Sequence, residues 1–232
     1  AGCAVAQNYA TVMLKWVEWS LGITCEVEGW ENVPDHPVVA MAKHQSAWET
    51  LFMESRFPPQ CWIVKRELLW LPFVGWSLYA IRCIAIDRSS GHSARDQIVE
   101  QGRRRLAQGM WVSIFPEGTR VAPGKAGRYG IGGALLATRT GTPILPLAHN
   151  AGEYWPRYAF RKRPGRVRVV IGPPIPTAGR DPVTVRFRPA APLPASLPVR
   201  VTVATGFEAM DGSSLPEPYT FIPPDERSIA LA

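Results

Sequence analysis

The chain has 232 residues, of which 46% are apolar and 19% charged, which indicates one globular domain with a sizeable core and at most an appendage. No run of 18 uncharged apolar residues occurs, so no segment of this sequence spans a bilayer as a single helix. The net charge is +7, and residues 101–188 hold 16 basic against 3 acidic residues, a surplus that attracts phosphate. No RNP-like, zinc-finger or helix-turn-helix pattern accompanies it, so a nucleic acid partner is not expected.

The first 23 residues are predicted to form an amphipathic helix that faces a membrane. Its apolar stripe ends near Gly22 and consists of Val5, Tyr9, Val12, Met13, Trp16 and Val17. Packing of this stripe on the domain is the equal alternative. Seven of the nine tryptophans lie in residues 1–100, where such rings suit contact with lipid headgroups or serve as ordinary core. The chain begins at Ala1 without a methionine, which is consistent with a missing upstream segment.

Residues 24–182 are predicted to form an α/β domain. Short β-branched and apolar runs alternate with helical patterns, an order typical of a largely parallel sheet of about seven strands flanked by helices. The predicted strands are residues 23–29, 37–44, 61–67, 83–88, 111–117, 143–149 and 166–172. The predicted helices are residues 46–57, 67–80, 92–108 and 130–140.

Residues 183–232 differ in character from the rest of the chain. They contain eight prolines and no helical stripe longer than two turns, which predicts a proline-rich, poorly ordered tail. Two origins stay open: a reading-frame shift that replaced the native end, and a genuine appendage.

The four cysteines give no sign of a metal site or a disulfide framework. They are isolated, form no CxxC pair and have no histidine at ligand spacing, so reduced thiols and no bound metal are expected. These residues are Cys3, Cys25, Cys61 and Cys83.

The stretch AKHQSAWETL places His44 where a buried strand gives way to a helix, with Glu49 about one turn into that helix. From there the carboxylate can reach back to one imidazole nitrogen, fix its tautomer and raise the basicity of the other. A histidine held in this way can remove a proton from a hydroxyl group. By itself the HxxxxE spacing is weak evidence for catalysis, because a surface histidine and a surface glutamate are often this far apart in a sequence.

The stretch IFPEGTR, residues 114–120, places several polar groups at the end of another strand. Gly118 allows the backbone to approach a ligand closely, and Arg120 offers a planar fork that suits a phosphate. A turn with a surface ion pair is the alternative.

Two further cations, Lys65 and Arg88, are predicted at strand ends on the same sheet edge, separated by the apolar stretch LLWLPFVGW. Cations beside an apolar wall suit an amphiphile with an anionic head and an alkyl chain.

Four motifs in this order, HQSxxE, KxEL…P…G…IDR, FPEGTR and GTPILPLAHNAG, resemble the glycerolipid acyltransferases of the HxxxxD type over residues 24–182. Within that family the chain is most similar to the bacterial 1-acyl-sn-glycerol-3-phosphate acyltransferases. The resemblance implies acyl transfer from acyl-CoA or acyl-carrier protein to the sn-2 hydroxyl of lysophosphatidic acid. No bound cofactor is expected, and the implied location is the cytoplasmic face of a bacterial inner membrane.

The resemblance also implies roles for individual residues. His44 matches the general base and Glu49 the carboxylate that orients it, although the family usually has aspartate there. Pro146 matches the block linked to the acyl donor. The residues implied in binding the acceptor phosphate are Glu117, Gly118, Thr119 and Arg120, with Lys65 and Arg88 adding positive charge. An acyltransferase on another lysolipid and a catalytically silent membrane-binding protein remain as alternative functions.

Overall fold

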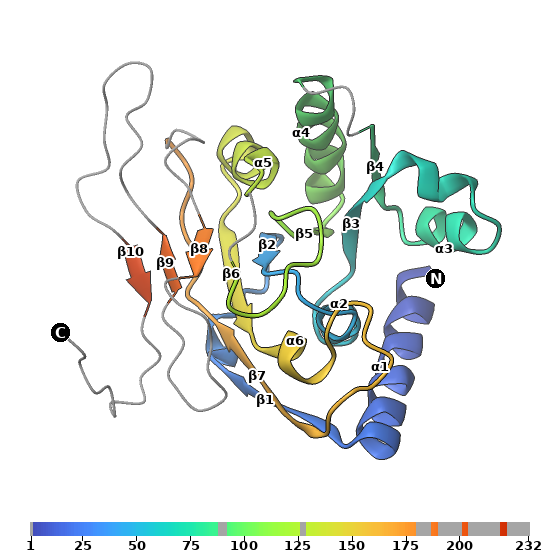
Figure 1. Ribbon diagram of the computed structural model, residues 1–232. Coiled ribbons are helices and arrows are strands. Elements are labelled where there is room, and N and C mark those ends of the chain that lie inside the picture. The colour runs from blue at the N-terminus through green and yellow to red at the C-terminus, as the bar shows by residue number, and fades with distance from the viewer. Residues whose placement is uncertain are drawn as a thin grey trace.

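The structure is a computed structural model of the chain, and it describes residues 2–87, 92–125 and 129–179 with three short strands beyond them (Figure 1). The main strands are β1 (Ile23–Glu28), β2 (Val39–Ala42), β3 (Gln60–Lys65), β4 (Ile84–Ile86), β5 (Trp111–Ile114), β6 (Ile144–His149) and β7 (Gly165–Ile171). The α-helices are α1 (Gly2–Leu21), α2 (Trp48–Arg56), α3 (Val74–Ala80), α4 (His92–Ala107), α5 (Gly132–Thr140) and α6 (Ala151–Tyr154). Two 3₁₀ turns are η1 (Trp30–Asn32) and η2 (Arg66–Trp70).

The seven main strands form one sheet in the order β1-β7-β6-β2-β5-β3-β4. Every neighbouring pair is parallel except β6 and β7. The predicted α/β fold with a largely parallel seven-stranded sheet is therefore confirmed, as are the helices that follow its strands. The predicted helix over 67–80 is divided into η2 and α3, because Pro72 cannot continue a regular helix.

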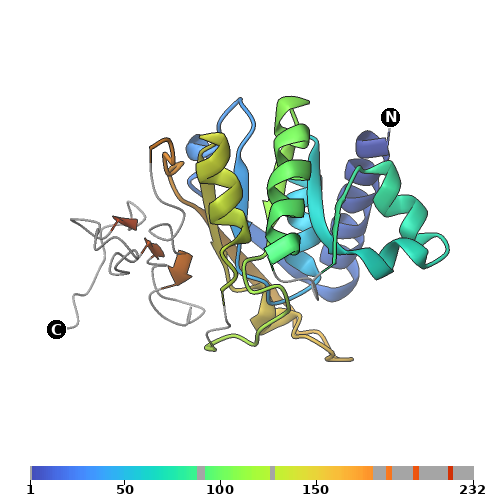
Figure 2. The same ribbon diagram turned by 90° about the horizontal axis from the view of Figure 1, so that it is seen from above.

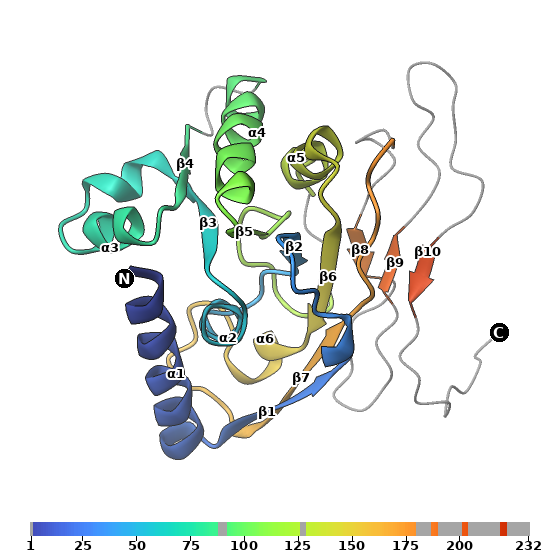
Figure 3. The same cartoon turned by 180° about the vertical axis from the view of Figure 1, so that it is seen from behind.

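Two apolar layers cover the two faces of this sheet. Alternate residues of β2 point to opposite sides, so Ala40 and Ala42 pack in one core cluster while Val39 and Met41 pack in the other. The first cluster is closed by α1 and α2, and the second by α4 and α5 (Figures 1 and 3). Because helices cover both faces, the central strands are largely apolar, which made them readable from the sequence. The buried polar residues Ser113 of β5 and Gln60 of β3 are hydrogen-bonded to each other.

Helix α1 packs against the domain and still keeps an apolar face exposed. Ala10 and Val17 are buried, and the helix lies against α2 and β1. Of the predicted stripe only Val17 is buried, whereas Val5, Tyr9, Val12 and Trp16 are more than half exposed. Packing on the domain and an outward apolar surface therefore coexist on one helix. Within the part of the chain that the structure describes, no helix is both long enough and apolar enough to cross a membrane.

Within the predicted tail, the structure describes β8 (Phe187–Pro189), β9 (Val201–Val203) and β10 (Tyr219–Phe221). They form an antiparallel sheet in the order β10-β9-β8, on the side of the domain away from α1 and α3 (Figure 2). The expectation of a poorly ordered, non-homologous tail otherwise falls outside the described residues.

Candidate active site

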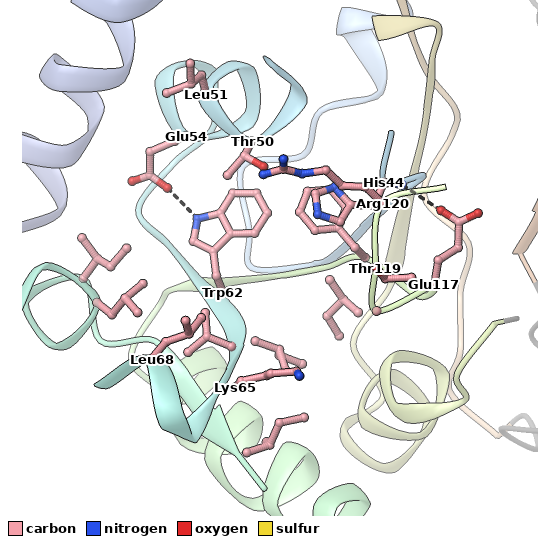
Figure 4. A pocket seen from close by; sticks show the side chains of 18 of the residues that line it. His44, Thr50, Leu51, Glu54, Trp62, Lys65, Leu68, Glu117, Thr119 and Arg120 are labelled. Atoms are coloured by element: carbon pink, nitrogen blue, oxygen red, sulfur yellow. Dashed lines mark hydrogen bonds between the residues drawn. The ribbon is translucent and has the colours of Figure 1, made fainter. Parts of the chain in front are cut away.

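Three neighbouring parallel strands end at one edge of the sheet, and the chemistry-bearing motifs follow them directly. His44 follows β2, the EGTR loop follows β5, and Lys65 is the last residue of β3. Carboxyl ends of parallel strands meet at the same edge, where open α/β sheets bind ligands. These residues line one cavity of about 1630 Å³, together with α1, α3 and α5 (Figure 4).

His44 and Glu49 are in contact, as the spacing predicts. The imidazole Nδ1 lies 2.9 Å from Glu49 Oε1, and the two side chains are 16% and 2% exposed. The same oxygen accepts hydrogen bonds from the backbone amides of Gln45 and Ser46, at 2.8 and 2.7 Å. Because Nδ1 donates to a carboxylate, Nε2 is the nitrogen that can accept a proton from a substrate.

The environment of Glu49 favours its charged form. Burial by itself raises the pKa of this carboxyl, but the nearby His149 ring, the hydrogen bond from His44 and the amide of Ser46 outweigh burial. The pKa of Glu49 is therefore below its ordinary value. A glutamate in place of the family's usual aspartate thus keeps the charged contact with the imidazole. Its second oxygen, Oε2, is buried without a hydrogen-bond partner.

The Glu117 carboxylate is turned away from the cavity toward the backbone of the His44 turn (Figure 4). Its Oε2 accepts the His44 amide at 3.0 Å, and its Oε1 lies 3.1 Å from Lys43 Nζ. Lys43 also donates to the carbonyl of Lys125 at 2.6 Å. Both charged side chains are buried, at 9% exposed for Lys43 and 0% for Glu117. Glu117 therefore links the loop after β5 to the turn after β2, and it also belongs to the residues that line the cavity. Its implied part in phosphate binding stays a prediction.

The His44 turn is held from its other sides as well. His149 Nε2 lies 2.6 Å from the Lys43 carbonyl oxygen, and the Val121 amide donates to the His44 carbonyl at 2.7 Å. The Gly152 amide donates to the side-chain oxygen of Gln45 at 3.2 Å. The segments that follow β5 and β6 thus fix the backbone that carries the imidazole.

Of the three cations implied in phosphate binding, the structure describes two, and both lie at the cavity. Lys65 and Arg120 line the cavity, as do Gly118 and Thr119. Arg88 lies outside the described residues. Arg157 also lines the cavity, and its Nη1 donates to the Arg120 carbonyl at 2.9 Å.

Pro146 is not among the residues that line the cavity. It is buried within β6, where it pairs in register with Met41 of β2, and its carbonyl accepts the Gly172 amide. Its implied link to the acyl donor stays a prediction.

The remaining walls of the cavity are largely apolar, with Thr50, Glu54 and Ser77 as polar exceptions. Helix α1 contributes Val5, Ala6, Tyr9 and Ala10, η2 contributes Leu68, α3 contributes Leu78, and Ile81 follows α3 directly. The side nearest α4 and α5 is formed by Ile86, Ile98, Ile114, Gly132 and Gly133. The site therefore joins a polar rim at the strand ends to an apolar interior.

The sequence reasoning missed several side chains of this site. A lysine inside the apolar stretch PVVAMAKH was the available signal for Lys43, and a histidine that ends β6 was the signal for His149. Arg157 follows the last helix of the site and had no motif to mark it. Phe115 stacks on His44, and Trp62 stacks on Phe115. Phe115 was read as a strand residue, and Trp62 as a strand residue and one of the rings that suit lipid headgroups or ordinary core.

Comparison with known proteins places the chain in a family. Residues 24–150 match the Acyltransferase family model, and the chain belongs to that family. It is 46% identical over 178 residues to the 1-acyl-sn-glycerol-3-phosphate acyltransferase of Pseudomonas aeruginosa, covering 77% of this chain and 69% of that relative. It is 33% identical over 174 residues to 1-acyl-sn-glycerol-3-phosphate acyltransferase alpha of Bos taurus, covering 74% of this chain but only 61% of that relative.

A solved structure supports the fold independently. The crystal structure of the 1-acyl-sn-glycerophosphate acyltransferase PlsC from Thermotoga maritima matches with a TM-score of 0.62 and 24% identity. The match covers 75% of this chain and 69% of that one.

The buried Lys43–Glu117 pair leads to a stability prediction. Glu117→Gln should lower the free energy of unfolding by about 3–5 kcal/mol, because it leaves the Lys43 ammonium buried without its counter-ion. Lys43→Met should cost a similar amount, and the double variant Lys43→Met/Glu117→Gln should cost clearly less than the sum of the two. Urea denaturation of the four proteins measures this. Additive losses would show that the two side chains are not coupled.

Proposed function

We propose that this protein transfers a fatty acyl group from a thioester donor to the sn-2 hydroxyl of 1-acylglycerol 3-phosphate, which yields phosphatidic acid. The observation that carries the proposal is a His44–Glu49 pair that opens onto the same cavity as Arg120 and an extended apolar wall. Such a cavity suits a substrate with a hydroxyl group, an anionic head and an alkyl chain. The names of the relatives in Pseudomonas aeruginosa and Bos taurus support this substrate class.

In the proposed reaction His44 acts as general base and then as general acid. Its Nε2 accepts the proton of the acceptor hydroxyl while the oxygen attacks the thioester carbonyl. The tetrahedral intermediate collapses, the carbon–sulfur bond breaks, and the imidazolium returns the proton to the thiolate. Glu49 holds the Nδ1 proton throughout and stabilises the imidazolium. Because the acceptor hydroxyl is itself the nucleophile, the reaction needs no acyl-enzyme.

The phosphate of the acceptor is proposed to bind Arg120, with Arg157 and Lys65 adding positive charge. Arg120 and Arg157 come from two different loops but are joined by the hydrogen bond from Arg157 to the Arg120 carbonyl. Among the described residues, no salt bridge joins a carboxylate to either guanidinium. Arg157 also donates to the Tyr158 hydroxyl at 2.8 Å, a neutral partner, so both guanidiniums can pair with an anion. Two guanidiniums around one phosphate would give a fixed orientation of the glycerol next to His44.

The apolar interior is proposed to take the acyl chains. A cavity of about 1630 Å³ exceeds the roughly 300–1,000 Å³ typical of small-ligand pockets, so it has room for parts of two lipid substrates. The donor would be acyl-CoA or acyl-carrier protein, without a bound cofactor. An apolar enclosure also keeps water from the thioester, which would otherwise be hydrolysed.

The protein is proposed to work on the cytoplasmic face of a bacterial inner membrane. Large apolar side chains are exposed on α1 and on the η2–α3 segment; we call this the apolar surface, and it consists of Val5, Tyr9, Val12, Trp16, Trp19, Leu68, Leu69, Trp70, Leu71, Phe73, Val74, Trp76 and Tyr79. In Figure 1 the N-terminal end of α1 lies next to α3, so the two groups adjoin. Exposed patches of this kind suit a lipid interface. Val5 and Tyr9 also line the cavity, so a lipid would reach His44 from that surface.

The general-base role of His44 is tested by substitution. His44→Ala should lower kcat by roughly 10²–10⁴-fold, because the acceptor hydroxyl loses the group that removes its proton. Release of coenzyme A with lysophosphatidic acid and an acyl-CoA in detergent measures this. His36→Ala is the matched control, since His36 is exposed and does not line the cavity. Activity of His44→Ala within a few-fold of wild type would refute the assignment.

The phosphate-binding role is tested by two charge-removing variants. Arg120→Gln and Arg157→Gln should each raise KM for lysophosphatidic acid by about tenfold or more, since a hydrogen bond to a charged group contributes about 1.5–3 kcal/mol. Neither variant should change KM for a monoacylglycerol that lacks the phosphate. Arg161→Gln, which is exposed outside the cavity, is the control. Equal effects on both acceptors would argue against phosphate recognition.

The apolar surface is tested with lipid vesicles. Trp19→Ser/Trp76→Ser should weaken co-sedimentation with phosphatidylglycerol–phosphatidylethanolamine vesicles by about tenfold or more, because each buried large apolar side chain contributes about 1.5–3 kcal/mol. Trp30→Ser is the control, because Trp30 is 45% exposed but lies on η1. Unchanged binding of the double variant would place the lipid contact elsewhere.

A further inference from the structure

Three aromatic rings form a continuous stack beside the cavity. The His44 and Phe115 rings are nearly parallel, at 9°, with centroids 4.0 Å apart. The Phe115 ring in turn stacks on Trp62, with centroids 5.3 Å apart at 23°. The stack therefore joins residues that follow or lie on β2, β5 and β3, three neighbouring strands. Its first ring is the proposed base, and its last ring faces the cavity interior (Figure 4).

Helix α2 supplies a carboxylate to each end of this stack. Glu49 accepts from the His44 ring at 2.9 Å, and Glu54 accepts from the Trp62 indole Nε1 at 2.7 Å. Each outer ring is thus fixed by a hydrogen bond, while Phe115 is held by packing alone, against the two outer rings and the first core cluster. One rigid helix therefore sets the positions of both outer rings.

Burial of the second carboxylate, that of Glu54, costs folding free energy, and the reaction proposed above does not use this group. Glu54 is 9% exposed and Trp62 is 7% exposed. Burial raises the pKa of Glu54, and the hydrogen bond from Trp62 offsets only part of that rise. A neutral acceptor or an apolar pair could fill the same space at lower cost. A buried carboxylate at this position is explained if it orients the Trp62 indole, on which Phe115 stacks.

We propose that Trp62 and Glu54 are positioning residues for His44, and that they act through Phe115. This inference rests on the acyl transfer proposed above. A single hydrogen bond to Glu49 fixes Nδ1 but leaves the imidazole free to tilt about that contact. Phe115 packs against one face of the ring and prevents the tilt, provided that Trp62 supports Phe115 from behind. The direction of Nε2 toward the acceptor hydroxyl then depends on Glu54 at the far end of the stack.

The stack is expected to affect turnover more than substrate binding. None of the three rings is proposed to hold the phosphate, although all three line the cavity that is proposed to take the acyl chains. Loosening the stack should therefore change substrate affinity less than it changes turnover. Small displacements of a reacting group reduce turnover strongly, by about 10²-fold for 1 Å. Loss of Trp62 or Glu54 should therefore lower kcat by a larger factor than it changes KM.

Steady-state kinetics of four variants test the proposal. Trp62→Ala should lower kcat by roughly 10-fold or more, because Phe115 loses its support, and it should change KM for either substrate by a smaller factor. Trp62→Phe keeps a ring and should restore kcat to within about threefold of wild type. Glu54→Leu should lower kcat, since the buried indole N–H loses its acceptor, whereas Glu54→Gln keeps an acceptor oxygen and should not.

A double variant distinguishes loss of the Glu54–Trp62 hydrogen bond from general destabilisation of the fold. Glu54→Leu should have no further effect in a Trp62→Phe background, because no indole N–H is left to satisfy. Trp30→Ala is the matched tryptophan control, and each variant is checked by thermal unfolding. Equal damage from Trp62→Phe and Trp62→Ala, or a raised KM without a change in kcat, would overturn the proposal.

A second readout needs no substrate and separates this inference from the proposed function. The rate at which diethyl pyrocarbonate modifies His44, followed by peptide mass spectrometry, reports access to the imidazole. It should rise in Trp62→Ala and Glu54→Leu but stay at the wild-type value in Trp62→Phe and Glu54→Gln. If the wild type fails to acylate lysophosphatidic acid, the proposed function fails, and these modification rates still decide whether the stack holds His44. Identical rates in all variants would refute the positioning role.

Discussion

The site depends on one oxygen atom, Oε1 of Glu49, which accepts hydrogen bonds from the His44 ring and from two consecutive backbone amides. The amides come from Gln45 and Ser46, where the chain turns from β2 into α2. A negative charge in the first turn of a helix is favoured by the unpaired amides and the helix dipole. The interaction that orders the turn is therefore also the one that orients the imidazole. A change that weakens it would disturb the backbone and the proposed base together.

The Lys43–Glu117 pair makes this turn part of a larger rigid unit. Buried ion pairs are weak contributors to net stability, because desolvation of both charges offsets their attraction. Their value here lies in specificity: Glu117 can satisfy Lys43 and the His44 amide only when the loops after β2 and β5 are in register. Arg120 lies three residues after Glu117 on the same loop. The pair thus relates the position of the proposed base to that of the proposed phosphate ligand.

Much of the fold could be predicted from the sequence, and the reason is physical. Strands buried on both faces are largely apolar, and helices with a period of 3.6 separate them, so seven strands and their order along the chain were readable. The contact of His44 with Glu49 was also predictable, since it spans five residues at a strand–helix junction. Contacts between distant residues were not. The direction of the Glu117 carboxylate depends on Lys43, 74 residues earlier, and no local pattern encodes that pairing.

The contacts of α1 were likewise not predictable from a local pattern, and they make this helix part of the site. Periodicity predicts an amphipathic helix over residues 1–23 but leaves open whether it faces a membrane or packs on the domain, because it cannot reveal which neighbours the helix contacts. In the structure Ala6 and Ala10 line the cavity, and Val17 joins the core cluster that contains Trp48 of α2. The helix is therefore one wall of the site as well as part of the apolar surface. A lipid that enters along α1 would move from one apolar environment to another, and its polar head would meet the charged rim only where His44 and Arg120 lie.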